Sequence, residues 1–185
     1  RMIADAVGMR QASLYHHFAN KDELLDSLLS GTVDEPLAVG RAVRDSDAPA
    51  VEKMYALAWC DADQLCRSKW NLGALYLLPE LREDRFSTFR AHRYALMDLY
   101  RSIATEVVAE PASTVPGVLD LPFRLVESVV NTRADTEYGR DAEGADYASV
   151  IAEAAVRVLG FTGPIAAVRA GAEILLERGT AILDR

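Results

Sequence analysis

The chain has 185 residues, half of them hydrophobic and 26% charged, with a formal net charge of −8. This length can bury a core, and no long apolar run or charged-then-apolar leader predicts a membrane span or a signal peptide, so we expect a soluble cytoplasmic protein. The two cysteines, Cys60 and Cys66, are spaced for neither a CxxC pair nor a zinc site, and we expect buried thiols with no metal or cofactor.

The acidic balance at first argues against a nucleic-acid partner, because the phosphate backbone attracts positive charge. The charge is unevenly distributed, however. Residues 1–21 carry Arg1, Arg10 and Lys21 against Asp5, a local charge of +2, which leaves −10 on the remainder. The basic end therefore remains compatible with DNA binding.

Apolar residues recur at spacings of three and four, and alternating β-branched runs are scarce, which predicts an all-α fold. Short helices are expected at residues 2–7 and 11–18. Asn20, with Glu23 three positions later, has the arrangement of a capping box and predicts the start of a third helix, which Pro36 should kink or end. Further helices are expected from residues 46–49 to 67 and at 71–78, 85–109, 119–134, 147–159 and 165–183, with a surface loop at 135–146.

The first two predicted helices form a helix-turn-helix layout. Residues 3–21 read IADAVGMRQASLYHHFANK, with a turn at Gly8. Four apolar side chains can pin the two helices together: Ile3, Val7, Leu14 and Phe18. The opposite face of the second helix is then free to enter the major groove of DNA.

This segment resembles the TetR (tetracycline-repressor-like) family of transcriptional regulators over about its first thirty residues. The matching positions are Ala4, Gly8, Ser13, Leu14, Tyr15, His17, Phe18, Asn20, Lys21, Leu24 and Leu25. The resemblance implies a DNA-binding domain at residues 1–32 and a helical ligand-binding and dimerisation domain at residues 33–185. Members of the family have one more helix before the turn unit, and we expect that first helix to be missing ahead of Arg1.

The resemblance also assigns DNA contacts within the helix-turn-helix. Base edges would be read by Arg10, Gln11, Tyr15 and His16, and phosphates would be held by Ser13, His17 and Lys21. Arginine and glutamine suit guanine and adenine edges, whereas hydroxyl, imidazole and ammonium groups suit phosphate oxygens. The alternative for each polar residue is an ordinary solvated helix face.

The helix predicted at 85–109 has an apolar seam that is interrupted by Arg93. This arginine either pairs with an internal carboxylate, or lies at the edge of the seam, or orients an anionic or polar ligand. The residues predicted to contact a small-molecule ligand in a cavity of the body are Trp59, Trp70, Tyr76, Phe89, Arg93, Met97, Glu127 and Asn131. Each of the large apolar ones is alternatively plain core.

The family forms dimers through late helices, and the resemblance places a homodimer interface on two of them. The predicted interface residues are Phe123, Val126, Val130, Tyr147, Val150, Ile151, Ala154 and Val158. The helix at 165–183 is a second candidate. The alternative is that these stripes close the core of a single chain.

These features predict a ligand-responsive transcriptional regulator, a repressor that binds a palindromic operator as a dimer and is released by a small-molecule effector. An enzyme is the main competing class, but His16 and His17 are adjacent, His92 stands alone, and no catalytic motif occurs. A third class is a helical small-molecule-binding protein without DNA binding.

Overall fold

The computed structural model describes residues 18, 20–68, 71–77, 79–108, 115–135 and 145–183, and within these ranges it contains helices and no strand. The α-helices are α3 (Lys21–Arg44), α4 (Ala50–Arg67), α5 (Ser87–Val107), α6 (Leu121–Ala134), α7 (Ala145–Val158) and α8 (Ile165–Leu183). Short 3₁₀ helices are η1 (Leu72–Leu77), η2 (Pro79–Arg82), η3 (Asp84–Phe86) and η5 (Val118–Asp120). The all-α prediction is confirmed, while the helices expected at 2–7 and 11–18 lie outside the described residues.

The start of α3 follows the predicted capping box. The side chain of Asn20 accepts a hydrogen bond from the backbone N–H of Glu23 at 2.9 Å, which satisfies one of the donors that a helix start leaves free. The expectation that Pro36 would kink or end the helix was wrong on the ending, because α3 continues to Arg44. Leu29 and Val33 are buried before the proline and Leu37 and Val43 after it, so burial along both halves offsets the hydrogen bond that proline cannot make.

Helix α4 is the centre of the molecule and packs against α3, α5, α6, α7 and α8. Twelve of its residues are buried, and they lie all around the helix instead of on one stripe. A helix enclosed by neighbours on every side is expected to bury residues on every side. The polar Asp61 and Asp63 are therefore buried as well.

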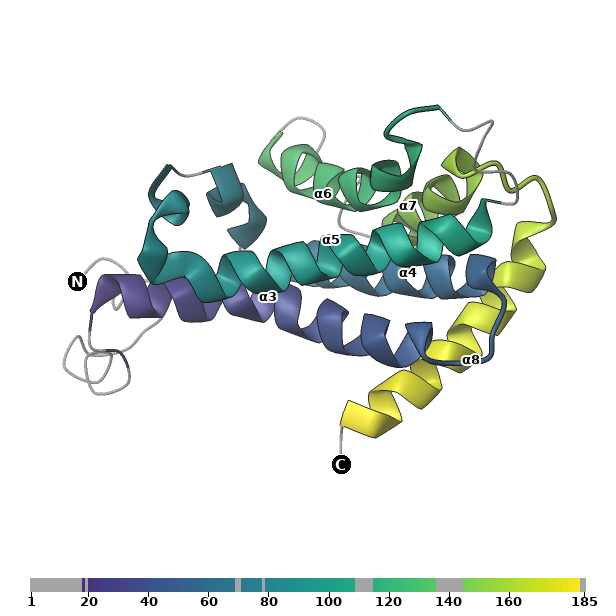
Figure 1. Cartoon of the computed structure of the whole chain (residues 1–185), viewed down its shortest axis with the longest axis horizontal. Helices are drawn as coiled ribbons and strands as arrows, with labels where there is room; N and C mark the ends of the chain where they lie inside the picture. Colours follow the sequence, from purple (N-terminus) through teal and green to yellow (C-terminus); the bar gives the residue numbers. More distant parts are fainter. Residues whose placement is uncertain are drawn as a thin grey trace.

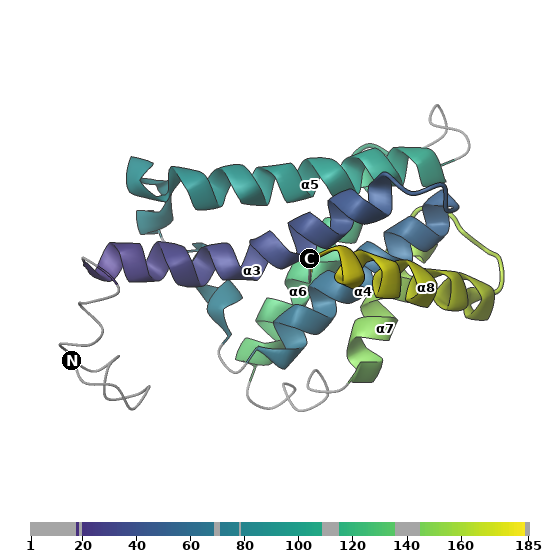
Figure 2. The same ribbon diagram turned by 90° about the horizontal axis from the view of Figure 1, so that it is seen from below.

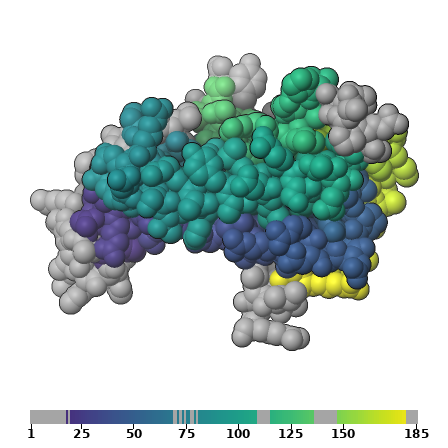
Figure 3. All heavy atoms as spheres, viewed as in Figure 1, coloured from purple at the N-terminus to yellow at the C-terminus, as the bar shows by residue number. Residues whose placement is uncertain are grey.

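Helices α3 and α5 lie side by side and run in the same direction (Figures 1 and 2). Helix α4 runs in the opposite direction, back from the C-terminal end of α3, and packs against both. In the space-filling view α5 forms a continuous band along α3 (Figure 3). The connection from α4 to α5 consists of η1, η2 and η3, which lie beside the N-terminal half of α3. A small separate core forms there from Leu29, Val33, Leu81, Phe86 and Phe89.

The larger core joins α4 to α6, α7 and α8 and also includes the C-terminal halves of α3 and α5. Helix α7 ends as predicted: Gly160 adopts a left-handed φ of 92° and the backbone N–H of Phe161 donates to Val156 O, a typical glycine C-cap. Arg157 donates to Phe161 O and Gly163 O and so holds the turn into α8. No described helix has the combined length and apolar character that a membrane crossing requires.

Candidate functional site

One predicted DNA contact falls within the described residues. Lys21 is the first residue of α3 and is exposed, next to the Asn20 cap. The remaining predicted DNA contacts, Arg10, Gln11, Ser13, Tyr15, His16 and His17, lie outside the described residues. The described part of the chain therefore reaches this segment only at the first turn of α3.

Five of the predicted ligand residues lie together around Arg93. Its guanidinium forms an ion pair with Glu127 of α6 and donates to the sulfur of Met97 at 3.8 Å. The guanidinium carbon lies 5.7 Å from the ring centre of Tyr76 and 5.4 Å from that of Phe123. The Arg93 and Glu127 side chains are only 21% and 20% exposed, so the pair is largely shielded from water. Arg93 thus has the internal carboxylate partner that was one of its three alternatives.

Tyr76 connects this cluster to α3. Its ring packs on Phe89 with centres 5.3 Å apart, and its hydroxyl shares a short hydrogen bond with the Thr32 hydroxyl. Burial is the largest cause that raises the pKa of Tyr76 to about 12, so the phenol stays protonated. Because Thr32 also donates to Leu29 O at 2.6 Å, Tyr76 ties η1 to the backbone of α3.

The other three predicted ligand residues are not in this cluster. Trp59 lines a separate pocket between α4, α7 and α8, where Arg169 donates to the hydroxyl of Tyr55 at 3.1 Å. Asn131 is exposed on α6. Trp70 lies outside the described residues.

A pocket of about 210 Å³ opens beside the Arg93 cluster, and we call it the arginine pocket. It is lined by Tyr76, Leu81, Arg82, Phe89, Arg90, Arg93 and Tyr94. Arg90 is held by donating to the carbonyls of Leu81 and Glu83, and Arg93 is paired with Glu127. Three of the predicted ligand residues therefore face a real pocket, whose charge is positive.

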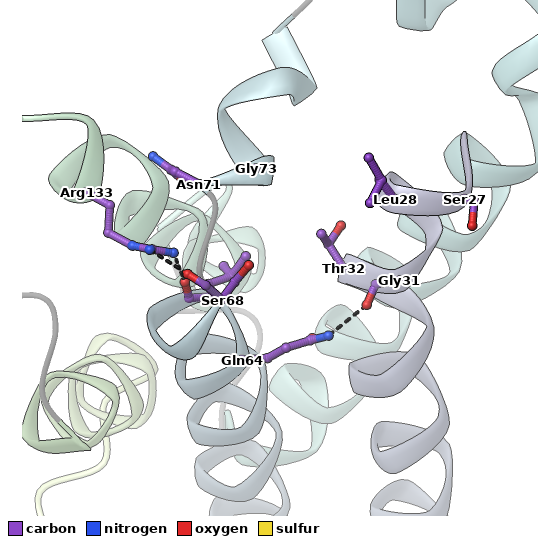
Figure 4. A pocket seen from close by; sticks show the side chains of 10 residues that line it. Ser27, Leu28, Gly31, Thr32, Gln64, Ser68, Asn71, Gly73 and Arg133 are labelled. Atoms are coloured by element: carbon purple, nitrogen blue, oxygen red, sulfur yellow. Dashed lines mark hydrogen bonds between the residues drawn. The ribbon is translucent and has the colours of Figure 1, made fainter. Parts of the chain in front are cut away.

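A second pocket, of about 270 Å³, lies on the other side of Thr32, and we call it the Gln64 pocket (Figure 4). Its lining comes from α3, from the end of α4, from the segment leading into η1, and from α6. The residues are Ser27, Leu28, Gly31, Thr32, Gln64, Leu65, Ser68, Asn71, Gly73 and Arg133. Figure 4 shows the Gln64 side chain reaching from α4 toward Gly31 of α3.

Hydrogen bonds fix the walls of the Gln64 pocket. Nε2 of Gln64 donates to Gly31 O at 2.7 Å, and the guanidinium of Arg133 donates to Leu65 O and to Ser68 O at the end of α4. Asn71, which stands directly before η1, donates to Val130 O of α6 at 2.8 Å. This hydrogen bond holds the start of η1 against α6. These contacts join α4 to α3, α6 to the end of α4, and the segment before η1 to α6.

Sequence reasoning missed Gln64, Thr32 and Arg133. A signal was present in α4, where Asp61 and Gln64 stand one turn apart in a largely apolar helix. Asp61 is fully enclosed and accepts a hydrogen bond from the Tyr100 hydroxyl at 3.0 Å. Burial raises the pKa of Asp61 to about 7, and the Tyr100 hydrogen bond only partly opposes this shift.

Comparison with known proteins identifies the family. Residues 1–28 match the family described as "Bacterial regulatory proteins, tetR family". The crystal structure of Mycobacterium smegmatis AmtR is 52% identical in sequence, with a TM-score of 0.85 over 96% of this chain and 83% of that one. The chain belongs to the TetR family. The HTH-type transcriptional repressor KstR2 of Mycobacterium tuberculosis is 46% identical over 57 residues, which are 31% of this chain and 28% of that repressor.

Members of the TetR family are transcriptional regulators and not enzymes, in agreement with the sequence.

Burial separates the residues predicted for a TetR dimer interface into two groups. Phe123, Val126, Val130 and Ile151 are at most 7% exposed in the single chain, so they close its own core and have little surface left for a partner. This burial favours the alternative that these residues close the core of a single chain, and their place in an interface remains a prediction.

The rest of the predicted TetR interface lies on α7 and keeps accessible surface. Val150 is 59% exposed, and Tyr147, Ala154 and Val158 are half-buried. On α8 the side chain of Ile174 is 51% exposed. Apolar surface is therefore available on the two last helices, where an interface remains a prediction.

Proposed function

We propose that this TetR-family protein is a transcriptional repressor that binds a palindromic operator as a dimer and releases it when a small molecule binds in the helical body. The observation that carries the proposal is the match of residues 1–28 to the family's regulatory proteins, together with 46% identity to a transcriptional repressor over 57 residues. The 52% identical AmtR structure supports the same architecture for the body.

In the proposed complex the second helix of the turn unit enters the major groove. Arg10, Gln11, Tyr15 and His16 read base edges, while Ser13, His17 and Lys21 hold phosphates. The exposed position of Lys21 at the start of α3 supports a phosphate contact, because its ammonium group is free to reach the DNA backbone. Loss of Arg10 or Gln11 is then expected to weaken and relax recognition.

Two copies are needed to read a palindrome. Recognition helices of a two-fold dimer lie about one DNA turn, roughly 34 to 36 Å, apart. The accessible apolar residues of α7 and α8, among them Val150 and Ile174, support an interface built from these two helices. The proposed interface does not include the residues that are already buried in the single chain.

The proposed release mechanism runs through α3, which continues from the DNA-binding segment into the body. Several contacts between described residues fasten α3 to neighbouring elements, among them the Thr32–Tyr76 hydrogen bond to η1, Asp22 to Arg85 at 2.8 Å, and Gln64 to Gly31 at 2.7 Å. A ligand beside the Arg93 cluster would shift η1 and, through Tyr76, would move α3. The spacing of the two recognition helices would change and operator binding would weaken.

The first experiment is a footprint of the full-length protein on DNA upstream of its own coding region. We expect a protected palindrome that is lost in high salt and in Arg10→Ala and Gln11→Ala variants. Folding of each variant is checked by circular dichroism. Absence of protection at low salt, both there and on a random-sequence pool, would replace the proposal with a helical small-molecule-binding protein that does not bind DNA.

Ligand release has its own test, because coupling between two binding sites is reciprocal. Once an effector is found, operator DNA must weaken its binding by the same factor by which it weakens operator binding. Equal effector affinity with and without operator in a calorimetric titration would contradict release by this route.

A further inference from the structure

We propose that Arg85 is a positioning residue for operator binding: it holds Asp22 and thereby fixes the first turn of α3, whose first residue, Lys21, is the proposed phosphate contact. Nη1 of Arg85 donates to Oδ2 of Asp22 at 2.8 Å, so this ion pair joins η3 to the start of α3 across 63 positions of the chain. The inference rests on the proposed function, because it gives a residue of the body a role in DNA binding.

The first turn of α3 needs support from outside the helix. A helix start has backbone N–H groups without partners inside the helix, so caps and side-chain contacts hold it. The Asn20 cap supplies one such hydrogen bond. Along α3 the small core begins at Leu25, three positions after Asp22. The Asp22–Arg85 pair therefore brings a contact with the body one turn closer to the DNA-binding segment, up to the residue beside Lys21.

The guanidinium of Arg85 is itself held in place from its own side. Its Nη2 donates to Oε1 of Glu83 at 3.1 Å, and its central carbon lies 5.3 Å from the ring centre of Phe86. Phe86 is 1% exposed and shares the small core with Leu29 of α3. An arginine fixed in this way loses little freedom when it also binds Asp22.

The position of the pair favours a role in DNA binding over a role in stability. The side chains of Arg85 and Asp22 are 44% and 41% exposed, and exposed ion pairs contribute little to folding stability. Because DNA is negatively charged, charge alone predicts that loss of Asp22 strengthens operator binding. The proposed contact predicts the opposite, since loss of Asp22 would release the turn that carries Lys21.

Operator titrations of the full-length protein, followed by fluorescence anisotropy, test the sign of this effect. Asp22→Ala and Arg85→Met, which keeps the stem of the side chain on Phe86, should each weaken binding about fivefold. The double variant should be no weaker than either single variant, because both changes remove one contact. Arg85→Lys should recover most of the affinity. Tighter binding by Asp22→Ala, or additive losses in the double variant, would overturn the proposal.

The matched control is a second exposed ion pair between an arginine and an aspartate. Arg101, in the C-terminal half of α5, donates to both carboxylate oxygens of Asp120. Arg101→Met removes the same charge and the same kind of contact far along α5 from Arg85, and it should bind the operator as the wild type does. An equal loss in Arg101→Met and Arg85→Met would assign the effect to net charge and would refute a role for the Asp22 contact.

The salt dependence of binding tests whether Arg85 acts through Lys21. Each phosphate contact that is lost lowers the slope of log affinity against log salt concentration by about 0.9. Arg85→Met should lower this slope as Lys21→Met does, and it should weaken binding no further when it is added to Lys21→Met. A full additional loss in that background would show that Arg85 acts independently of Lys21, contrary to the proposal.

Failure of this inference is distinguishable from failure of the proposed function. If the wild type protects no operator, the proposed function fails, and the role of Arg85 fails with it. If the wild type binds an operator and Arg85→Met binds it equally tightly, the regulator stands and the role of Arg85 is refuted. Thermal unfolding followed by circular dichroism should give nearly the same midpoint for the wild type, Asp22→Ala and Arg85→Met, as expected for an exposed pair.

Discussion

The two halves of the helical body are held together by different chemistry. Helices α4 and α7 pack against each other and carry small residues that are completely buried: Ala56, Ala58 and Ala62 on α4, and Ala148, Ala152 and Ala155 on α7. Near the C-terminal end of α4, polar contacts are added to the apolar core: Gln64 joins α4 to α3, Arg133 joins α6 to α4, and the Thr32–Tyr76 hydrogen bond joins α3 to η1.

The difference indicates which half can change shape. Alanines let helix backbones approach closely, and the pocket lined by Trp59 opens beside this contact, toward α8. Polar connections between helices also border a pocket, and Gln64 Oε1 has no hydrogen-bond partner among the described residues. We therefore regard the α4–α7 contact as the rigid frame and the end around Thr32 as the adaptable part.

The largest predicted effect is on the pH dependence of stability and comes from Asp61, which is buried in α4 between the two halves. Its folded pKa of about 7 lies above the ordinary value of 3.8, so the folded protein binds a proton more tightly than the unfolded chain. Wild-type stability should therefore be favoured at low pH and should fall as the pH rises from about 4 to about 7. Asp61→Asn should lack this fall and be more stable at pH 8, by at most about 4 kcal/mol.

Urea unfolding of both proteins at several pH values measures that difference. Asp98→Asn, at an exposed position of α5, is the control and should change the pH profile little. Parallel profiles for the wild type and Asp61→Asn would mean that Asp61 is ionised in the folded protein, and the boundary would have to be drawn elsewhere.

The next effect tests the rigid frame. Ala152 on α7 has no exposed surface, and its replacement by leucine should destabilise the fold by about 3 kcal/mol, because the close-packed helices cannot accept the added volume. Denaturant unfolding of Ala152→Leu beside Ala91→Leu, whose side chain is exposed, isolates the packing effect. A tolerated leucine at 152 would remove the proposed contrast between the halves.

A smaller effect is expected in the polar half, at the Arg93–Glu127 pair. Arg93→Met should cost about 2 kcal/mol because it leaves a largely shielded Glu127 carboxylate with only its contact to Arg124. The double variant Arg93→Met, Glu127→Gln should recover most of the loss. Equal stability of the single and double variants, measured by thermal unfolding, would show that the carboxylate does not need Arg93.

The smallest effect compares two glycines on α3. Gly31→Ala should stabilise the protein by about 0.5–1 kcal/mol, because alanine favours the helix and its Cβ enters open space. Gly40→Ala should destabilise it, since the added Cβ would lie 2.5 Å from Leu99 Cδ2 and 2.8 Å from Leu57 Cδ1. Changes of the same sign at both positions would argue against the open space assigned to the Gln64 pocket.

Local sequence determined the order and extent of the described helices. The Asn20 cap and the turn at Gly160 depend on residues within a few positions of each other, so the chain alone specifies them. The family resemblance, too, rested on a contiguous motif, and it is confirmed. The effect of Pro36 was predicted less well, because a local rule for proline does not count the burial that α3 gains on both sides.

The partners within the site were decided only by tertiary structure. Arg93 and Glu127 are 34 positions apart, and Thr32 and Tyr76 are 44 apart. A periodic pattern predicts which face of a helix is apolar, but it does not say which other helix that face meets. For this reason the sequence indicated that Arg93 needed a partner, and only the packing of α5 on α6 supplied Glu127. The Gln64 pocket, formed by segments distant in the chain, could be found only in the folded molecule.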